Sequence, residues 1–179
     1  MRRQAEHFLQ DFQHDFAFTF LPARHNTIRN IREGRCVHFT KMNGAGNDFI
    51  LLDAIAEPFD EAAAPALARA LCDRRRSIGA DGLMLVTRAE GDADYRMRFY
   101  NSDGSLGEMC GNGARCICRY GYARGYAGPV QRVETTAGLV TGWRITEEQY
   151  RIRLNTPSVV ELEKQLTVDG RTYRCSYVE

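Results

Sequence analysis

The segment Asn101–Arg119, which reads NSDGSLGEMCGNGARCICR, holds the residues with the clearest chemical potential. Cys110 is followed there by Gly-Asn-Gly at 111–113 and then by a stretch of helix-forming composition. Cys110 is therefore predicted to lie directly before a helix start. At such a position, unpaired backbone N–H groups and the positive end of the helix dipole favour a thiolate and also bind carboxylates.

This combination suits an enzyme that moves a proton at the α-carbon of an amino acid without a cofactor. The α-proton is weakly acidic, so its removal needs a nearby base and donors that stabilise charge on the substrate carboxylate. A thiolate at Cys110 would be the base, and the exposed amides would be the donors. The alternative is that Cys110 is a small buried hydrophobic side chain, as many free cysteines are.

A strand and a helix flank Cys110 in the sequence. Tyr95–Tyr100 alternates apolar side chains with arginines, which predicts a strand with one buried face. Ser102–Gly104 is predicted to form a turn after that strand. The helix after Cys110 has small or apolar residues for one packed face, namely Ala114, Ile117, Cys118 and Gly121.

The rest of the chain alternates strand and helix signals. We expect strands at Val37–Lys41, Phe49–Asp53, Leu83–Val86 and Tyr150–Leu154, a loop at Asn43–Asp48, a helix at Pro65–Arg74, and hairpins with turns at Ala137–Gly138 and Asp169–Gly170. The run Arg74–Arg76 is interpreted as the solvated carboxyl end of that helix, and Gly79, Asp81 and Gly82 as a turn without a catalytic role. Many antiparallel strands with two helices predict an α+β domain.

The composition is that of an ordinary folded protein. The 179 residues are 44% hydrophobic and 26% charged, with a formal charge of +1, so a nucleic-acid partner is not expected. A membrane-spanning role is not expected either, because no apolar run approaches the roughly 20 residues that crossing a bilayer requires.

The six cysteines are expected to be reduced thiols of a cytoplasmic protein, because their spacing is irregular and no secretion signal is evident. We expect no metal site, since Cys116 and Cys118 would point to different faces of a helix.

Four segments, in this order, resemble the diaminopimelate epimerase family: KMNGAGNDF (Lys41–Phe49), IGADGL (Ile78–Leu83), NSDGS (Asn101–Ser105) and MCGNGARC (Met109–Cys116). Each segment alone is a modest signal, but the ordered set is specific. The resemblance implies a single α+β lobe in which a mainly antiparallel, barrel-like sheet surrounds a central helix.

The resemblance also implies a mechanism and a site. In this family two lobes face each other and contribute one cysteine each, so that one thiolate removes the α-proton while the opposite thiol protonates the other face. The substrate would be diaminopimelate, whose LL and meso forms are interconverted for lysine and peptidoglycan synthesis without a cofactor. The implied site residues are the catalytic Cys110 and the substrate-binding Asn47, Asn101, Gly111 and Asn112. Asparagines also often bond only to their own turn, and that interpretation stays open.

The resemblance divides the chain at residue 37. Residues 1–36 are interpreted as an extension that is either poorly ordered or translated from upstream of the true start, and residues 37–179 as the amino-terminal lobe, with the carboxyl-terminal lobe missing. We therefore expect the isolated chain to be inactive or nearly so, and a homodimer or a complementing second lobe as its macromolecular partner.

Two other functions remain open. One is another isomerase of the same architecture, such as a proline racemase or a phenazine-type isomerase. These relatives typically have histidine where this chain has Asn112. The other is a non-catalytic half-fold that binds a partner or ligand.

Overall fold

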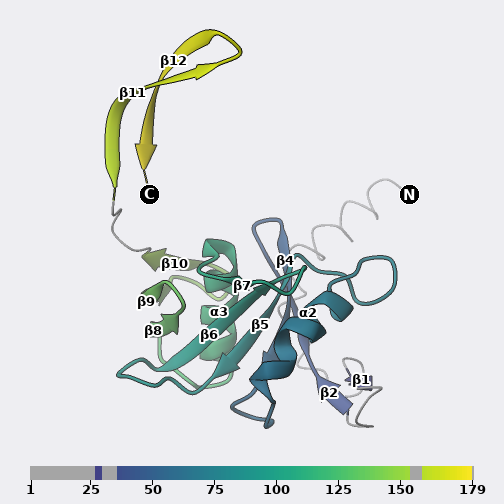
Figure 1. Cartoon of the computed structure of the whole chain (residues 1–179). Coiled ribbons are helices and arrows are strands. Elements are labelled where there is room, and N and C mark those ends of the chain that lie inside the picture. The colour runs from purple at the N-terminus through teal and green to yellow at the C-terminus, as the bar shows by residue number, and fades with distance from the viewer. Residues whose placement is uncertain (1–26, 30–35, 154–158, 179) are drawn as a thin grey trace, which may run out of the picture.

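The structure is a computed structural model that describes residues 27–29, 36–153 and 159–178. Its central feature is an 8-stranded sheet (Figure 1) in which neighbouring strands follow the order β10-β9-β8-β6-β5-β4-β3, with β7 paired to β6. The strands are β3 (Thr40–Gly44), β4 (Asn47–Asp53), β5 (Gly82–Thr87), β6 (Tyr95–Asn101), β7 (Leu106–Gly107), β8 (Val130–Thr135), β9 (Gly138–Arg144) and β10 (Tyr150–Arg153).

Most neighbouring strands are antiparallel, as predicted, but β4 pairs with β5 and β6 pairs with β8 in parallel. A parallel pair needs a crossover connection. The helix α2 (Ala64–Leu71), which follows the 3₁₀ turn η1 (Glu61–Ala63), lies between β4 and β5 in the chain. The helix α3 (Gly111–Ala123) lies between β6 and β8. The α+β class is confirmed, and both helices serve as crossovers.

The two helices cover opposite faces of the sheet (Figure 1). Along β4, Phe49 and Leu51 pack into the cluster that contains α3, whereas Ile50 and Leu52 pack into the cluster that contains α2. Successive side chains of a strand point to opposite faces. The central strands therefore read as continuous apolar runs, because both of their faces are buried.

The sheet curls around α3, which is the central helix that the sequence predicts. This helix contacts β3 and β4 near one edge of the sheet and β9 and β10 at the other edge. The predicted face is confirmed, since Ala114, Ile117, Cys118 and Gly121 are all buried. Close packing requires a glycine at one of these positions: a Cβ on Gly121 would lie 2.5 Å from the Tyr95 hydroxyl.

The helix predicted at Pro65–Arg74 is shorter than expected. It ends at Leu71, whose carbonyl accepts a hydrogen bond from Gly79 N at 2.9 Å. Asp73 then accepts hydrogen bonds from the backbone N–H groups of Arg75 and Arg76 and so stabilises a turn. The arginine run is therefore not on the helix, and its interpretation as a helix end is wrong.

The predicted hairpins are present. Asp169 and Gly170, both at positive φ, connect β11 (Val160–Val168) with β12 (Arg171–Val178). The hairpin of β8 and β9 turns at residues 136–137. The loop expected at Asn43–Asp48 is instead a tight hairpin, because Ala45 and Gly46 alone form its turn, with φ of 52° and 98°.

The first part of the chain is described only in short pieces. Within the predicted extension at 1–36, β1 (Thr27–Arg29) pairs antiparallel with β2 (Cys36–His38), so the strand expected at Val37–Lys41 is divided between β2 and β3. Residues 1–26 and 30–35, and the predicted strand end at Leu154, lie outside the described residues. None of the helices in the described ranges has the length and apolar character to span a membrane.

Candidate active site

Cys110 is the N-cap residue of α3, so the helix start predicted directly after it is confirmed. Its backbone is extended (φ −135°, ψ 112°), and its Sγ accepts a hydrogen bond from Gly113 N at 3.4 Å. A side-chain oxygen of serine or aspartate usually fills this role. Here the acceptor is sulfur, which lies at the amino end of the helix, where the helix dipole is positive.

Cys110 also differs from the other thiols of α3 in its surroundings. It is half-buried and packs against the edge of the core, whereas Cys116 and Cys118 are only 4% and 0% exposed. Burial raises the pKa of both inner thiols to about 12. Cys110 is therefore partly accessible to solvent, although it also packs against the core as a small hydrophobic side chain would. Within the described ranges, no three His, Cys, Asp or Glu side chains are grouped to hold a metal ion.

The hairpin of β3 and β4 approaches the first turn of α3 closely. A Cβ on Gly44 would lie 2.7 Å from both Asn112 O and Cys116 Sγ, so only glycine allows this contact without a shift. The approach brings two predicted site residues together: Asn112 Nδ2 donates to Asn47 Oδ1 at 2.6 Å. Asn47 and the loop after Cys110 therefore form one polar cluster.

Asn101 lies at the same end of the sheet but bonds within its own turn. Gly82 is paired with Phe49 on one side and with Asn101 on the other, which places Asn101 beside the start of β4. The Asn101 amide donates to Ser105 Oγ at 2.9 Å, and its backbone N–H donates to Ser105 O. The backbone N–H and the hydroxyl of Ser105 also donate to Asp103 Oδ1, at the end of the predicted turn. The structure thus connects Asn47 to Asn112 by a direct hydrogen bond. Asn101 is related to Asn47 only by strand pairing through Gly82.

A charged cluster beside Asn47 was not predicted as part of the site. Lys41 Nζ lies 2.9 Å from Asp48 Oδ2, and the Arg74 guanidinium donates to the carboxylates of both Asp48 and Asp81. Burial alone would raise the pKa of Asp48, but hydrogen bonds and charge from Arg74 and Lys41 outweigh it and lower the pKa to about 2.

Asp81 connects this charged cluster to the asparagines. Its Oδ2 accepts from Asn47 Nδ2 at 3.0 Å and from Asp48 N at 3.1 Å. The interpretation of Gly79, Asp81 and Gly82 as a simple turn therefore left out the polar contact that Asp81 makes. Lys41, Asp48 and Asp81 lie within KMNGAGNDF and IGADGL, the first two segments that carry the family resemblance, and this was the available signal.

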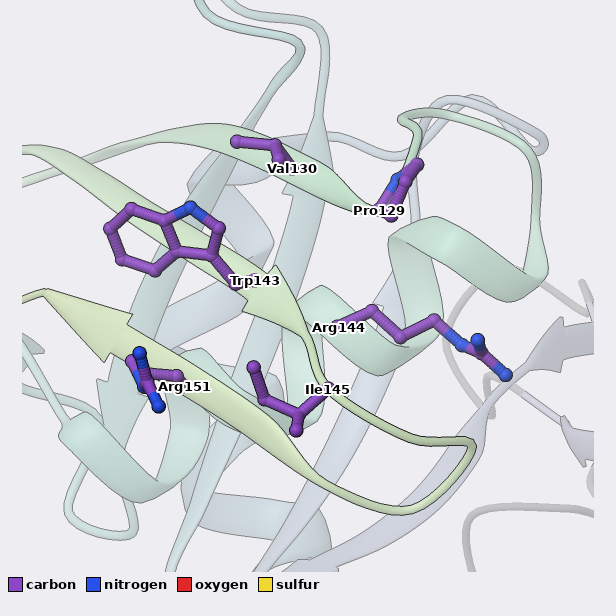
Figure 2. A pocket seen from close by; sticks show the side chains of 6 residues that line it. All are labelled: Pro129, Val130, Trp143, Arg144, Ile145 and Arg151. Carbon is purple, nitrogen blue, oxygen red and sulfur yellow. The ribbon is translucent and has the colours of Figure 1, made fainter.

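A shallow depression of about 220 Å³ lies elsewhere, on β8 to β10 (Figure 2). Its lining residues are Pro129, Val130, Trp143, Arg144, Ile145 and Arg151. None of them is a predicted site residue, and none offers a nucleophile or a base at ordinary pH. We therefore locate the candidate site by its chemistry at Cys110 rather than by this hollow.

Comparison with known proteins gives a family match. The family model described as diaminopimelate epimerase matches residues 39–160. The chain is 42% identical to the diaminopimelate epimerase of Moorella thermoacetica, over 77% of this chain and 55% of the relative. It is 40% identical to that of Caldanaerobacter subterraneus subsp. tengcongensis, over 79% of this chain and 56% of the relative. The chain thus spans about half the length of the curated relatives it matches.

Solved structures share the fold at lower sequence identity. A Bacillus anthracis phenazine biosynthesis protein of the PhzF family superposes with a TM-score of 0.51 at 21% identity, covering 73% of this chain and 43% of that protein. A methylitaconate-delta-isomerase gives the same TM-score at 14% identity, covering 75% and 38% of the two chains. At these identities the likeness concerns the architecture alone.

Proposed function

Because this chain belongs to the diaminopimelate epimerase family, we propose that it carries one of the two thiols that interconvert LL- and meso-diaminopimelate without a cofactor. The observation that supports this most directly is the position of Cys110, whose sulfur accepts an N–H at the amino end of α3 and remains half-buried rather than enclosed. A base that must reach a substrate needs both properties.

In the proposed mechanism the Cys110 thiolate takes the α-proton and becomes a thiol. The electron pair of the broken C–H bond stays on the α-carbon and is delocalised into the adjacent carboxylate. A thiol on the opposite face gives its proton to the α-carbon and becomes a thiolate, so the centre is inverted and the total charge is unchanged. In the reverse direction the two thiols exchange roles.

The first turn of α3 is suited to hold the substrate carboxylate. The Gly113 N–H already bonds to Cys110 Sγ, and Ala114 N–H bonds to Cys110 O. Helix geometry leaves the N–H groups of Gly111 and Asn112 for another acceptor. Hydrogen bonds from these groups would strengthen as negative charge moves onto the carboxylate during proton removal. Asn47 and Asn101 complete the proposed substrate-binding set.

We place the opposite thiol on a second lobe and the reaction in the cytoplasm, where lysine and peptidoglycan precursors are made and thiols stay reduced. A proline-racemase-like reaction is the runner-up. It is less well supported because Asn112, which stands where those enzymes typically have histidine, has no acid or base function and is bonded to Asn47.

The first test is protection of Cys110 from alkylation. Either diaminopimelate isomer at saturation should slow the reaction of Cys110 with iodoacetamide about tenfold, because a bound substrate would cover the thiol. Cys175, an exposed thiol on β12, is the internal control and should react at an unchanged rate. Pimelate, which lacks the α-amino groups, should protect less. Equal alkylation of Cys110 with and without diaminopimelate would contradict the proposal.

The second test measures proton exchange in deuterated water. One thiol reaches one face of the α-carbon, so this chain alone should not invert either isomer at a useful rate. ¹H NMR of the α-position together with chiral separation of the product would report this. Robust α-deuteration with inversion by the chain alone, lost in Cys110→Ser, would show that Cys110 acts with a partner base within these residues and would refute the two-lobe arrangement.

A further inference from the structure

Hydrogen bonds connect four side chains in a row, from the charged cluster to the first turn of α3. Arg115 donates to Asn112 Oδ1. Asn112 Nδ2 donates to Asn47 Oδ1 at 2.6 Å, and Asn47 Nδ2 donates to Asp81 Oδ2 at 3.0 Å. We propose that Asp81 is a positioning residue, which fixes the orientation of both asparagine amides at the site. The consequence of this orientation for substrate binding rests on the proposed function.

The chemistry of the two end residues, Arg115 and Asp81, allows only one direction of donation along this row of hydrogen bonds. A guanidinium can only donate, and an ionised carboxylate can only accept. Between them, the asparagine amides must each accept on the Arg115 side and donate on the Asp81 side. Turning either amide by 180° would place a donor against a donor or an oxygen against an oxygen. Arg115 and Asp81 therefore fix the orientation of both amides from opposite ends, and Asp81 acts on Asn112 through Asn47.

The Asp81 carboxylate is itself held in place from several directions. Its Oδ2 also accepts from Asp48 N at 3.1 Å, and its Oδ1 accepts from the Arg74 guanidinium at 2.8 Å. The Asp81 backbone N–H donates to Asp48 O at 2.9 Å. These bonds fix both oxygens, so the carboxylate offers Asn47 an acceptor in one fixed position.

The orientation decides what the site presents to a ligand. A side-chain amide has two N–H donors, and the chain of bonds uses one from Asn47 and one from Asn112. The second N–H of each amide remains as a donor for a further acceptor. Donors on these two side chains, next to the amino end of α3, match a carboxylate rather than an ammonium group. Asp81 thereby selects the carboxylate end of the substrate at this position.

The closing experiment uses NMR of the full ¹⁵N,¹³C-labelled chain. Asp81→Asn keeps the shape of the side chain but allows a donor to face Asn47. We expect it to move the side-chain amide signals of Asn112 as well as those of Asn47. Arg74→Gln is the comparison variant, because it removes the ion pairs of the same loop but leaves the Asp81 acceptor. It should leave the Asn112 amide signals in place. An unchanged Asn112 signal in Asp81→Asn would overturn the proposal.

A measurement on the unmutated chain covers the case in which Asp81→Asn does not fold. Couplings across hydrogen bonds should connect Asn47 Nδ2 with the Asp81 carboxyl carbon and Asn112 Nδ2 with the Asn47 side-chain carbonyl. A correlation of Asn47 Nδ2 with any other carbonyl carbon would overturn the proposal without a variant.

Protection of Cys110 by diaminopimelate distinguishes a failure of this proposal from a failure of the proposed function. In Asp81→Asn, about tenfold more diaminopimelate should be needed to protect Cys110 from alkylation, and Asp60→Asn, at an exposed turn, should behave like the unmutated chain. If diaminopimelate protects none of these proteins, the proposed function fails while the NMR result still decides the role of Asp81. If the same concentration of diaminopimelate protects Asp81→Asn and the unmutated chain equally, Asp81 does not position the asparagine amides for substrate binding.

Discussion

Cys110, Cys116 and Cys118 follow one another along α3 but have different surroundings. The first caps the helix at the edge of the core, and the other two face into the core on the helix sides that contact the sheet. Because only a thiolate is a good nucleophile, the reactivity of each sulfur depends on whether its environment accepts a charge. The same residue type can therefore act as a base at one position and as packing at the next.

This difference predicts a selective alkylation pattern. At pH 8, iodoacetamide should modify Cys110 and the exposed Cys175 in the folded chain but leave Cys116 and Cys118 unmodified, because burial holds their pKa at about 12 and also excludes the reagent. Peptide mass spectrometry would identify the modified residues. Repeating the reaction in urea should label all of them. Modification of Cys118 as fast as Cys110 in the folded chain would contradict the burial that the structure shows.

The lowered pKa of Asp48 predicts that the free energy of unfolding decreases at acidic pH. Its pKa is lowered from 3.8 to about 2, so the ion pairs with Lys41 and Arg74 stabilise the folded state fully above about pH 4. This contribution is about 2 kcal/mol and should disappear as the pH falls from about 4 to about 2. Urea unfolding of Asp48→Asn should show a loss of this size at pH 7 and a flatter acid slope. A variant as stable as the unmutated chain at pH 7 would rule out this role.

Among the elements, the β3 and β4 hairpin does most to assemble the site. Its two-residue turn at Ala45 and Gly46 keeps both strands paired up to Asn47, so that Asn47 is held on a strand rather than in a loop. The hairpin then meets α3 where Gly44 has no side chain. The position of Asn47 relative to Asn112 therefore depends on this one close contact.

Gly44→Ala tests that contact. The added Cβ would lie 2.7 Å from Asn112 O and from Cys116 Sγ, so the hairpin and the helix must separate. We expect a loss of about 1–3 kcal/mol in the free energy of unfolding. The alkylation rate of Cys110 should also change, since its helix turn moves. Gly91→Ala is the matched control, because a Cβ there meets nothing within 4 Å. Equal stability of the two variants would show that the contact is loose.

The sequence predicted the elements better than their junctions. The Asp169–Gly170 turn, the strand at Tyr95 and the helix start after Cys110 were predictable because each depends on local backbone preferences. The end of α2 was not, because it depends on Asp73 capping the next turn. Asp81 was also missed, since its contact with Asn47 joins segments that are distant in the sequence.

For the molecule as a whole, α3 is tied to both ends of β4. Asn112 at its first turn bonds to Asn47, where β4 begins. Tyr120 and Tyr126, at and beyond its last turn, donate to Asp53, where β4 ends. A strand of 7 residues and a helix of 13 residues are both about 20 Å long, so the two elements match in length. The base of the proposed reaction is thus held on a rigid pair of elements.

The β11 and β12 hairpin is held differently, and this predicts an uneven distribution of stability. Its strands form a separate two-stranded sheet (Figure 1), and every residue of β11 is exposed, including Leu162 at 72% and Leu166 at 52%. A two-stranded hairpin alone is only marginally stable in water. Its backbone amides should therefore exchange with deuterium through local opening, long before those of the doubly covered strands β4 and β5.

Hydrogen exchange followed by mass spectrometry would measure this in the full chain. Peptides from residues 160–178 should exchange at least about a hundredfold faster than peptides from β5, because local opening requires much less free energy than global unfolding. A chain that lacks residues 159–179 provides the control, and its remaining peptides should exchange at unchanged rates. Protection of the hairpin equal to that of β5, rising with protein concentration, would instead mean that its exposed apolar side chains are covered by a second copy of the chain.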